Sequence, residues 1–271
     1  MTGKPTLSSA PVPRSTMTSL AEPDAPIAVG TAVHPVSRLR FAVAVTALAT
    51  GGFAIGTTEF VTMGLLPQIA DGVGVTIPQA GHLISAYALG VVVGAPLLAA
   101  LGAKLPRRGL LVGLIAAFGL LNLLSAAMSH YGLLAFVRFL DGLPHGAYFG
   151  VSALVASGMV SPERRGRALA LVMMGIPVAN LAGVPAATLL GQAYGWRAAY
   201  VAVGLVSVLT VVMILAFVPS TPGDATATGR RELAALRHPQ LWYAVGAGAI
   251  GFGGLFALVS YIAPLTTDVG G

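Results

Sequence analysis

The sequence predicts an all-α integral membrane protein. Hydrophobic residues make up 56% of the 271 residues, charged residues make up only 9%, and the mean hydropathy is +0.85. Soluble domains carry a charge on roughly a quarter of their residues. The apolar residues of this chain are grouped in long runs, and a run of about 20 such residues crosses a lipid bilayer as one helix. The composition therefore excludes a water-soluble core and favours several membrane-spanning helices.

Seven apolar runs of this length follow one another along the chain. They cover roughly residues 41–64, 78–102, 109–128, 132–158, 168–190, 198–218 and 241–264. The connection after the first run, residues 67–77, carries turn residues. At its end Thr76 precedes Pro78, which predicts a helix that starts with a threonine cap and has a proline in its first turn.

Lysine and arginine residues gather in short clusters between the runs. Every basic residue except Arg138 and Arg197 lies on the same side of the predicted membrane. Because cytoplasmic loops carry an excess of basic residues, this pattern predicts a multi-pass protein of the plasma or inner membrane with a cytoplasmic N-terminus. The same clustering accounts for the net charge of +6, so we predict no nucleic-acid partner.

The residue types present exclude several classes of protein. The chain has no cysteine, and therefore no disulfide framework, thiolate metal site or cysteine nucleophile. The H-E-x-x-H and G-x-S-x-G motifs of metalloproteases and hydrolases are absent as well. A retinal-binding receptor needs a lysine in its last helix, and the lysines of this chain, Lys4 and Lys104, lie elsewhere. We therefore predict that the protein is not an enzyme and holds no metal or cofactor.

The fourth run carries ionisable residues in an otherwise apolar stretch. Arg138, Asp141 and His145 are spaced three and four residues apart, so a helix places them on one face. Because ionisable groups are costly in lipid, this face is predicted to turn toward the protein interior or a water-filled path. Glycine recurs at every fourth position of the same run, namely Gly142, Gly146 and Gly150. Such a spacing lets a second helix approach closely.

The charged face allows three interpretations. In the first, Asp141 binds a proton when Arg138 leaves it and releases the proton when Arg138 returns, which couples transport to protons. In the second, the two residues form a static ion pair that ties the fourth helix to its neighbours. In the third, the helix starts near Gly142 and both residues lie in an outer loop.

Other polar residues of the runs are also open to two interpretations. Glu59 is the carboxylate of the first run, and counting residues along the helix places it in the outer part of the membrane, as it does Arg138. Glu59 is therefore either a proton or cationic-substrate site near Arg138 or a carboxylate that reaches the membrane surface. His145 either titrates near neutral pH or makes an interior hydrogen bond. Asn180, like Asn122, either lines a cavity or joins two helices.

Three motifs resemble those of one transporter family. RFLDGLPHGAYFG, residues 138–150, is similar to a fourth-helix motif with a membrane-embedded arginine. MGIPVANLAGVPAATLLGQAYGWR, residues 174–197, is similar to a fifth-helix antiporter motif, and TTEFVTMGLLPQIA, residues 57–70, to a first-helix signature. Over roughly residues 38–271 the chain resembles the major facilitator superfamily, in particular its bacterial drug:proton antiporters and sugar exporters.

This resemblance implies a function and a set of residues that carry it. The implied activity is proton-coupled efflux, by antiport, of a small organic compound such as a drug or a sugar, with drug resistance as one consequence. The implied partners are that compound, protons and the lipid bilayer. The implied proton and substrate pathway comprises Glu59, Arg138, Asp141, His145 and Asn180. In the fifth helix, Gly183 and Pro185 take the Gly-Pro positions of the family motif, where they form either a hinge or seal or a site of close packing alone.

The loop after the second run departs from the family pattern. The family carries a glycine, an aspartate and basic residues there. The glycine and the basic residues are matched by Gly94, Lys104, Arg107 and Arg108. Ala103 stands where the aspartate is expected, so a cytoplasmic charge-pair latch through that aspartate is not expected here.

The resemblance also predicts how the chain is divided. Residues 1–37, rich in Pro, Ser, Thr and Ala, form a disordered cytoplasmic tail. Residues 38–218 form the N-terminal six-helix half of a major facilitator fold, and residues 219–240 form a central cytoplasmic loop. Residues 241–271 form a seventh helix that opens an incomplete second half, because the family has two halves of six helices. The alternative function is accordingly a truncated, non-transporting fragment or a half-transporter that needs its missing second half.

Overall fold

The computed structural model describes residues 37–223 and 237–268, and these residues form helices and no strand. The predicted all-α fold is thus confirmed for the described part of the chain. Almost all of the predicted tail and the middle of the predicted central loop, residues 224–236, lie outside it. The helices are α1 (Arg38–Gly64), α2 (Leu66–Val73), α3 (Ile77–Gly102), α4 (Arg107–Ala127), α5 (Tyr131–Gly158), α6 (Arg165–Met173), α7 (Gly175–Val178), α8 (Val184–Tyr194), α9 (Trp196–Phe217) and α11 (Pro239–Asp268), with short turns η1 (Pro162–Arg164) and η2 (Ala179–Gly183).

Six stretches of the described residues are long and apolar enough to cross a membrane: Arg38–Gly64, Ile77–Gly102, Arg107–Ala127, Pro162–Tyr194, Trp196–Phe217 and Pro239–Val259. They correspond to six of the seven predicted runs. The remaining run forms α5, which is as long as its neighbours but has the charged face described above. The structure buries Arg138 and Asp141 of that face inside the bundle, which is how a helix with two charges is accommodated among apolar ones.

The ends of the first helices follow from local sequence. Ser37 caps α1 by accepting a hydrogen bond from the backbone N–H of Arg40 at 3.3 Å. Thr76 caps α3 together with Gln79 in a reciprocal pair of hydrogen bonds, so the predicted helix start is confirmed. The predicted turn over residues 67–77 is wrong in its first part, because Leu66–Val73 forms α2 and ends at Gly74 in the left-handed conformation. The apolar side chains of α2, which include Ile69, hold it against the bundle.

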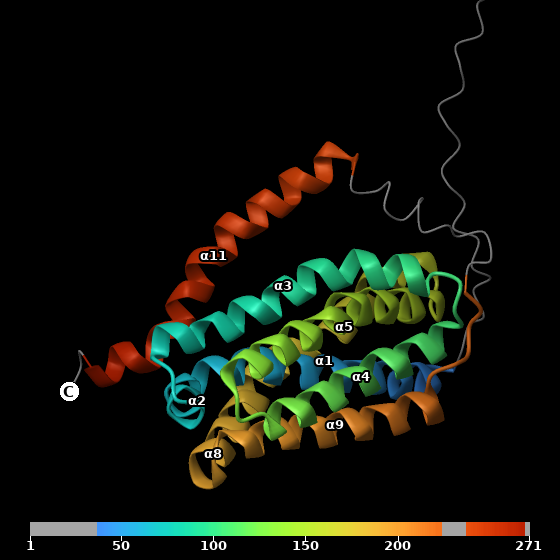
Figure 1. Ribbon diagram of the computed structural model, residues 1–271. Coiled ribbons are helices and arrows are strands. Elements are labelled where there is room, and N and C mark those ends of the chain that lie inside the picture. Colours follow the sequence, from blue (N-terminus) through green and yellow to red (C-terminus); the bar gives the residue numbers. More distant parts are fainter. Residues whose placement is uncertain (1–36, 224–236, 269–271) are drawn as a thin grey trace, which may run out of the picture. The chain divides into compact units, whose positions relative to one another are not determined.

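The long helices from α1 to α9 run alternately in opposite directions and pack side by side, whereas α11 lies at an angle to them (Figure 1). The most extensive contact is between α3 and α5, and α4 packs against both α5 and α9. α1 contacts α9 and each part of the fifth span, from α6 to α8. The core lies where α1, α4, α5 and α9 meet, with Leu48, Ile115, Phe118 and Tyr148 fully buried.

The fifth span is not one regular helix. It passes from α6 through α7 into a π-helical turn at Ala179–Gly183 and continues as α8. Pro185, in the first turn of α8, has no N–H to donate to the carbonyl of Leu181 one turn earlier, which favours a break in the regular ladder at this point. The proline indicated an interrupted hydrogen-bond ladder here, and the structure has a π-helical turn at this point.

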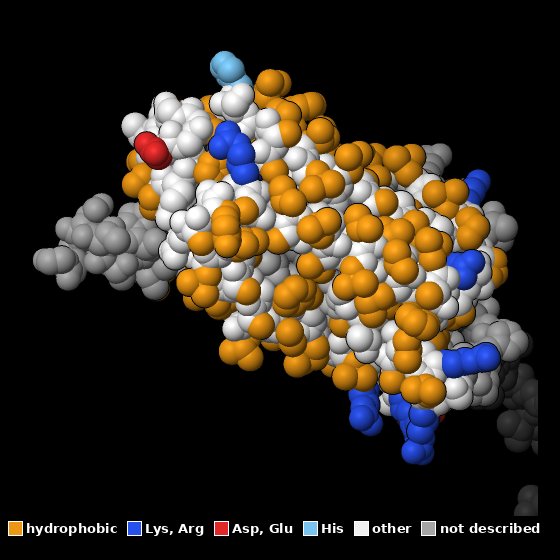
Figure 2. All heavy atoms as spheres, turned by 90° about the horizontal axis from the view of Figure 1, so that it is seen from below, with side chains coloured by type: hydrophobic (Ala, Val, Ile, Leu, Met, Phe, Trp, Pro, Cys, Tyr) orange, Lys and Arg blue, Asp and Glu red, His pale blue; other side chains and the backbone are white. Residues whose placement is uncertain are grey.

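Hydrophobic side chains cover the middle of the face drawn in Figure 2, while Lys and Arg side chains gather mainly at one end. The same end holds the segment that follows α9. There the N–H of Arg107 donates to the carbonyl of Thr221 at 2.9 Å, and a guanidinium nitrogen of Arg108 lies 3.4 Å from the carbonyl of Leu215. A side chain at Gly223 would overlap the backbone of Lys104. The start of the predicted central loop therefore lies against the α3–α4 connection.

Candidate functional site

The centre of the site is an ion pair on α5. The Nη1 of Arg138 donates to the Oδ2 of Asp141 at 2.5 Å, and the two side chains are 1% and 0% exposed. The spacing of three residues on one helix brings the two groups to the same face, as the sequence predicted. Removing either partner would leave an uncompensated buried charge, so the pair depends on both members and on further polar contacts.

Arg138 is held by contacts from three other helices. Its guanidinium carbon lies 4.4 Å from the ring centre of Tyr87 on α3 and 5.4 Å from that of Tyr200 on α9. Its Nη2 lies 3.4 Å from the hydroxyl of Thr62 on α1. The Nε of Arg138 is buried, and the described residues offer it no hydrogen-bond partner. Aromatic faces stabilise a desolvated guanidinium, which offsets part of the cost of burying it.

Asp141 is held from the other side by α4. The Nδ2 of Asn122 donates to the Oδ1 of Asp141 at 2.9 Å and to the backbone carbonyl of Phe118 at 2.9 Å. The Oδ1 of Asn122 accepts a hydrogen bond from the hydroxyl of Thr58 at 2.7 Å. The amide of Asn122 thus connects the carboxylate on α5 to a hydroxyl on α1.

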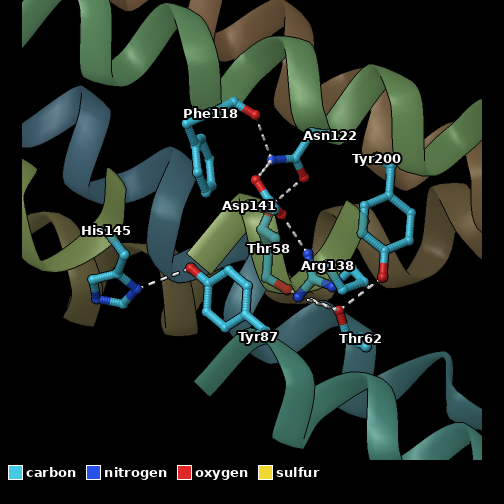
Figure 3. Close-up of polar contacts among 9 residues, drawn as sticks. All are labelled: Thr58, Thr62, Tyr87, Phe118, Asn122, Arg138, Asp141, His145 and Tyr200. Carbon is cyan, nitrogen blue, oxygen red and sulfur yellow. Dashed lines mark hydrogen bonds and ion pairs between the residues drawn. The ribbon is translucent and has the colours of Figure 1, made fainter. Parts of the chain in front are cut away.

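Two threonines on α1 complete the network. The hydroxyl of Thr62 lies 2.9 Å from that of Tyr200 and 3.0 Å from the carbonyl of Thr58, to which it donates. Figure 3 shows how these side chains, from α1, α3, α4, α5 and α9, converge on the ion pair. Every long helix of the first six spans except the fifth therefore contributes a group to one buried polar cluster.

His145 joins this cluster through Tyr87. The Nδ1 of His145 lies 2.9 Å from the hydroxyl of Tyr87. The guanidinium of Arg138 lies over the ring of the same tyrosine. Phe149, one turn further along α5, packs against the imidazole at 5.4 Å between ring centres. The interior hydrogen bond considered for His145 is thus present.

Glu59 lies beside the cluster and not within it. Its side chain is half-buried on α1, and the hydrogen bonds and ion pairs of the described residues include none to it. The contact of α1 with Arg138 is made by Thr62, almost one turn further on.

The other predicted residues lie away from the ion pair. Asn180 is exposed on the π-helical turn. Gly183 closes that turn against α1, where a side chain would overlap the hydroxyl of Thr57 and the ring of Phe53. Pro185 follows in the first turn of α8.

Gly94, which the sequence grouped with the cytoplasmic loop, lies inside α3, where a side chain would overlap the backbone of Leu143 on α5. Lys104, Arg107 and Arg108 follow at the α3–α4 connection, as predicted from their order in the chain.

The sequence did not single out Thr58, Thr62 or Tyr200. Thr58 and Thr62 are four residues apart in the first run, so they share a helix face, and this spacing was the available signal. Tyr200 lies near the start of an apolar run. A tyrosine at such a position is often at the membrane surface and not in the interior. Nothing local distinguishes the two cases.

A groove between α1, α8 and α9 lies apart from the cluster. It encloses about 520 Å³ and is lined by small apolar residues such as Ala54, Ala186 and Ala202. Its one hydroxyl, that of Thr57, donates to the carbonyl of Phe53. The groove therefore offers no free polar group that would orient a substrate.

Comparisons with known proteins agree with this architecture. A family model described as Major Facilitator Superfamily matches residues 48–271. Inner membrane transport protein YdhP of Escherichia coli strain K12 is 44% identical over 223 residues, covering 82% of this chain and 57% of that protein. Chloramphenicol resistance protein of Streptomyces lividans is 40% identical over 228 residues, covering 83% and 58%. The chain thus spans somewhat more than half the length of these curated relatives.

Solved structures share the fold. The POT family transporter PepTSo superposes with a TM-score of 0.59 at 13% identity, covering 71% of this chain and 40% of that one. Peptide transporter POT in complex with sulfate gives a TM-score of 0.55 at 15% identity, covering 80% and 46%. At such low identity the likeness concerns the arrangement of helices alone.

Proposed function

The chain belongs to the major facilitator superfamily, and on that premise we propose that it takes part in proton-coupled export of a small organic compound. Its helices and its relatives make it a multi-pass membrane protein. We place it in the plasma or inner membrane with its N-terminus in the cytoplasm, because its basic residues cluster at one end of the helices. The substrate would lie near the middle of the bilayer, beside helices that expose it alternately to the two sides.

The observation that carries the proposal is the buried pair of Arg138 and Asp141. A proton that binds Asp141 removes the negative charge that holds Arg138. The arginine then needs another partner, and the helices that contact it must adjust. In this way one proton selects between two arrangements of α1, α3, α5 and α9.

Glu59 and His145 are proposed as further members of the pathway. Glu59 is half-buried on α1, on the same helix as Thr62, which contacts Arg138, and the described residues offer it no hydrogen bond, so it is available to a proton or a cationic compound. His145 is tied to Arg138 through the ring of Tyr87 and would respond to its movement. Gly183 and Pro185 would allow the fifth span to bend during this change.

The relative named chloramphenicol resistance protein suggests a first compound to test. The chain is produced in bacteria that lack their own exporters, and uptake of radiolabelled chloramphenicol is measured with and without a proton uncoupler. We expect the chain to lower accumulation, the uncoupler to abolish that effect, and Asp141→Asn to abolish it without the uncoupler. Asp71→Asn, a carboxylate outside the buried cluster, serves as the matched control and should export normally.

Export that continues unchanged in the presence of the uncoupler would contradict proton coupling. If chloramphenicol is not exported, a panel of uncharged and cationic drugs and of sugars replaces it in the same assay. The pattern of accepted compounds then defines the substrate class.

A second candidate is a half-transporter, favoured by the share of its relatives that the chain spans, 57% of YdhP and 58% of the chloramphenicol resistance protein. In this case the chain alone would insert in the membrane without lowering accumulation. Co-production with the remaining part of such a relative as a separate polypeptide would restore export. Export by the chain alone would exclude this candidate.

A further inference from the structure

Both oxygens of Asp141 face hydrogen-bond donors. Oδ2 accepts from Arg138 at 2.5 Å, and Oδ1 accepts from Asn122 at 2.9 Å. An ionised carboxylate is an acceptor on both oxygens, so this arrangement fits the charged form. A protonated carboxyl has an O–H on one oxygen, and this proton cannot occupy a lone pair that accepts from Arg138 or Asn122 without displacing that donor.

The amide of Asn122 is fixed in its orientation. Its Nδ2 lies 2.9 Å from the backbone carbonyl of Phe118, and a carbonyl can only accept. Its Oδ1 lies 2.7 Å from the hydroxyl of Thr58, which donates to it. Turning the amide over would bring two oxygens together at Phe118, so Asn122 presents an N–H to Asp141 and not an acceptor.

The two oxygens of Asp141 are therefore not equivalent sites for a proton. A proton on Oδ1 would meet the N–H of Asn122, which is held in place from two sides. A proton on Oδ2 would meet Nη1 of Arg138. The guanidinium can give up this hydrogen bond because it keeps its contacts with the rings of Tyr87 and Tyr200. The proton would take Oδ2, and Arg138 would be the group that leaves.

We propose that Asn122 is a positioning residue that keeps the proton off Oδ1 of Asp141, so that proton binding and release of Arg138 become one event. This inference rests on the proposed function of the same site. In the step itself, a hydronium ion gives up a proton and becomes water, the proton forms an O–H bond at Oδ2, and the hydrogen bond from Nη1 to Oδ2 breaks. Arg138 keeps its charge, and no other covalent bond changes.

The other ionisable groups around Asp141 come from four helices. They are Tyr87 on α3, Tyr200 on α9, His145 one turn further along α5 and, further out, Glu59 on α1. α4 contributes only the amide of Asn122 to this contact within the described residues. None of these groups donates to Oδ1, so Asn122 alone determines which oxygen is free.

Without Asn122 the two events would separate. In Asn122→Leu, Oδ1 has no donor and can carry the proton while Oδ2 continues to accept from Arg138. In Asn122→Ser, the hydroxyl can accept as well as donate, so it does not exclude the proton from Oδ1 either. Both variants would bind a proton without releasing the arginine.

Solid-state NMR of the full chain in lipid vesicles tests this directly. The carboxyl carbon of Asp141 reports protonation and the guanidinium nitrogens of Arg138 report pairing; Asp141→Asn and Arg138→Lys assign the two signals. In the parent chain we expect both signals to change together as the pH is lowered. In Asn122→Leu and Asn122→Ser we expect the Asp141 signal to change and the Arg138 change to be lost. Thr46→Val, which also replaces a polar side chain by an apolar one but at an exposed position of α1, should behave as the parent.

Two results would overturn the inference. One is an Arg138 signal that follows Asp141 in both Asn122 variants, and the other is a parent chain in which Asp141 is protonated while Arg138 stays paired. Asn122→Ser preserves a polar side chain, so the test remains valid if Asn122→Leu does not fold. Export that is insensitive to an uncoupler would contradict the proposed function, whereas these NMR results bear on Asn122 alone.

Discussion

Arg138 shows how a full charge is kept inside a bundle that is otherwise apolar. Its partners are one carboxylate, two aromatic rings and a weakly bonded hydroxyl, each from a different helix except Asp141, which is its neighbour on α5. None of these contacts alone offsets the desolvation of a guanidinium. Removing one member of the pair leaves the other charge buried without compensation, which makes the stability of the bundle sensitive to the loss of either charge.

The first prediction concerns this sensitivity. Arg138→Met leaves the charge of Asp141 buried without its partner, and Asp141→Leu leaves the charge of Arg138 buried without its partner. Each single variant should therefore lose about 3–5 kcal/mol of stability, whereas the double variant should unfold close to the parent. Thermal unfolding of the purified chain in detergent measures all four states of this cycle. Single variants as stable as the parent would show that water reaches the pair.

Thr62 is the subject of the second prediction. Its hydroxyl forms hydrogen bonds with Tyr200, Arg138 and a backbone carbonyl. Thr62→Val removes the hydrogen bonds to Tyr200 and Arg138. We expect a loss of about 1–3 kcal/mol in the same unfolding assay. Thr46→Val is the matched control on α1, because that exposed hydroxyl bonds only the carbonyl of Ala42, and it should change stability by less than about 0.5 kcal/mol. Equal effects at the two positions would contradict a special role for Thr62.

At the scale of elements, the contact between α3 and α5 depends on glycine. A side chain at Gly90 would overlap the carbonyl of Phe139, and one at Gly142 would overlap the carbonyl of Tyr87. The two backbones therefore touch, which brings the ring of Tyr87 over Arg138. Close approach of this kind replaces side-chain packing between membrane helices.

The third prediction follows from this contact. Gly142→Ala should destabilise the chain by about 1–3 kcal/mol, because the added methyl group forces α3 and α5 apart. Gly150→Ala, two turns further along α5, meets no atom within 4 Å and should stabilise the chain by about 0.4–1 kcal/mol through reduced freedom of the unfolded state. Thermal unfolding should therefore show a lower stability for Gly142→Ala and a higher stability for Gly150→Ala than for the parent. A destabilised Gly150→Ala together with a neutral Gly142→Ala would refute the packing argument.

The apolar runs predicted where the helices lie, but they did not predict the irregular backbone inside the fifth span. Gly183 and Pro185 indicated a break, since proline removes a backbone donor. The form of the break depends on α1, whose Phe53 and Thr57 leave no room for a side chain at Gly183. Such a contact joins residues more than a hundred positions apart, and no local pattern records it.

The same limit applies to the whole molecule and its site. Arg138, Asp141 and His145 were predicted to share a face because they lie on one helix, where spacing determines direction. Glu59 was expected to meet Arg138 from counted depth alone, and depth does not specify rotation about the helix axis. Rotation brings Thr62 to Arg138 instead. Contacts across helices, such as Asn122 with Asp141, required the packed structure.

The orientation of the whole molecule leads to the last prediction. Because the chain has no cysteine, single cysteines can be introduced without removing native ones. Ser129 and Ser161 are both exposed and lie at opposite ends of α5, so Ser129→Cys and Ser161→Cys form a matched pair. If basic residues mark the cytoplasmic side, a membrane-impermeant thiol reagent should label Ser129→Cys in intact cells. It should label Ser161→Cys, which precedes Arg164, Arg165 and Arg167, only after the membrane is opened. The reverse labelling pattern would show that the molecule has the opposite orientation in the membrane, and that protons reach Asp141 from the opposite side.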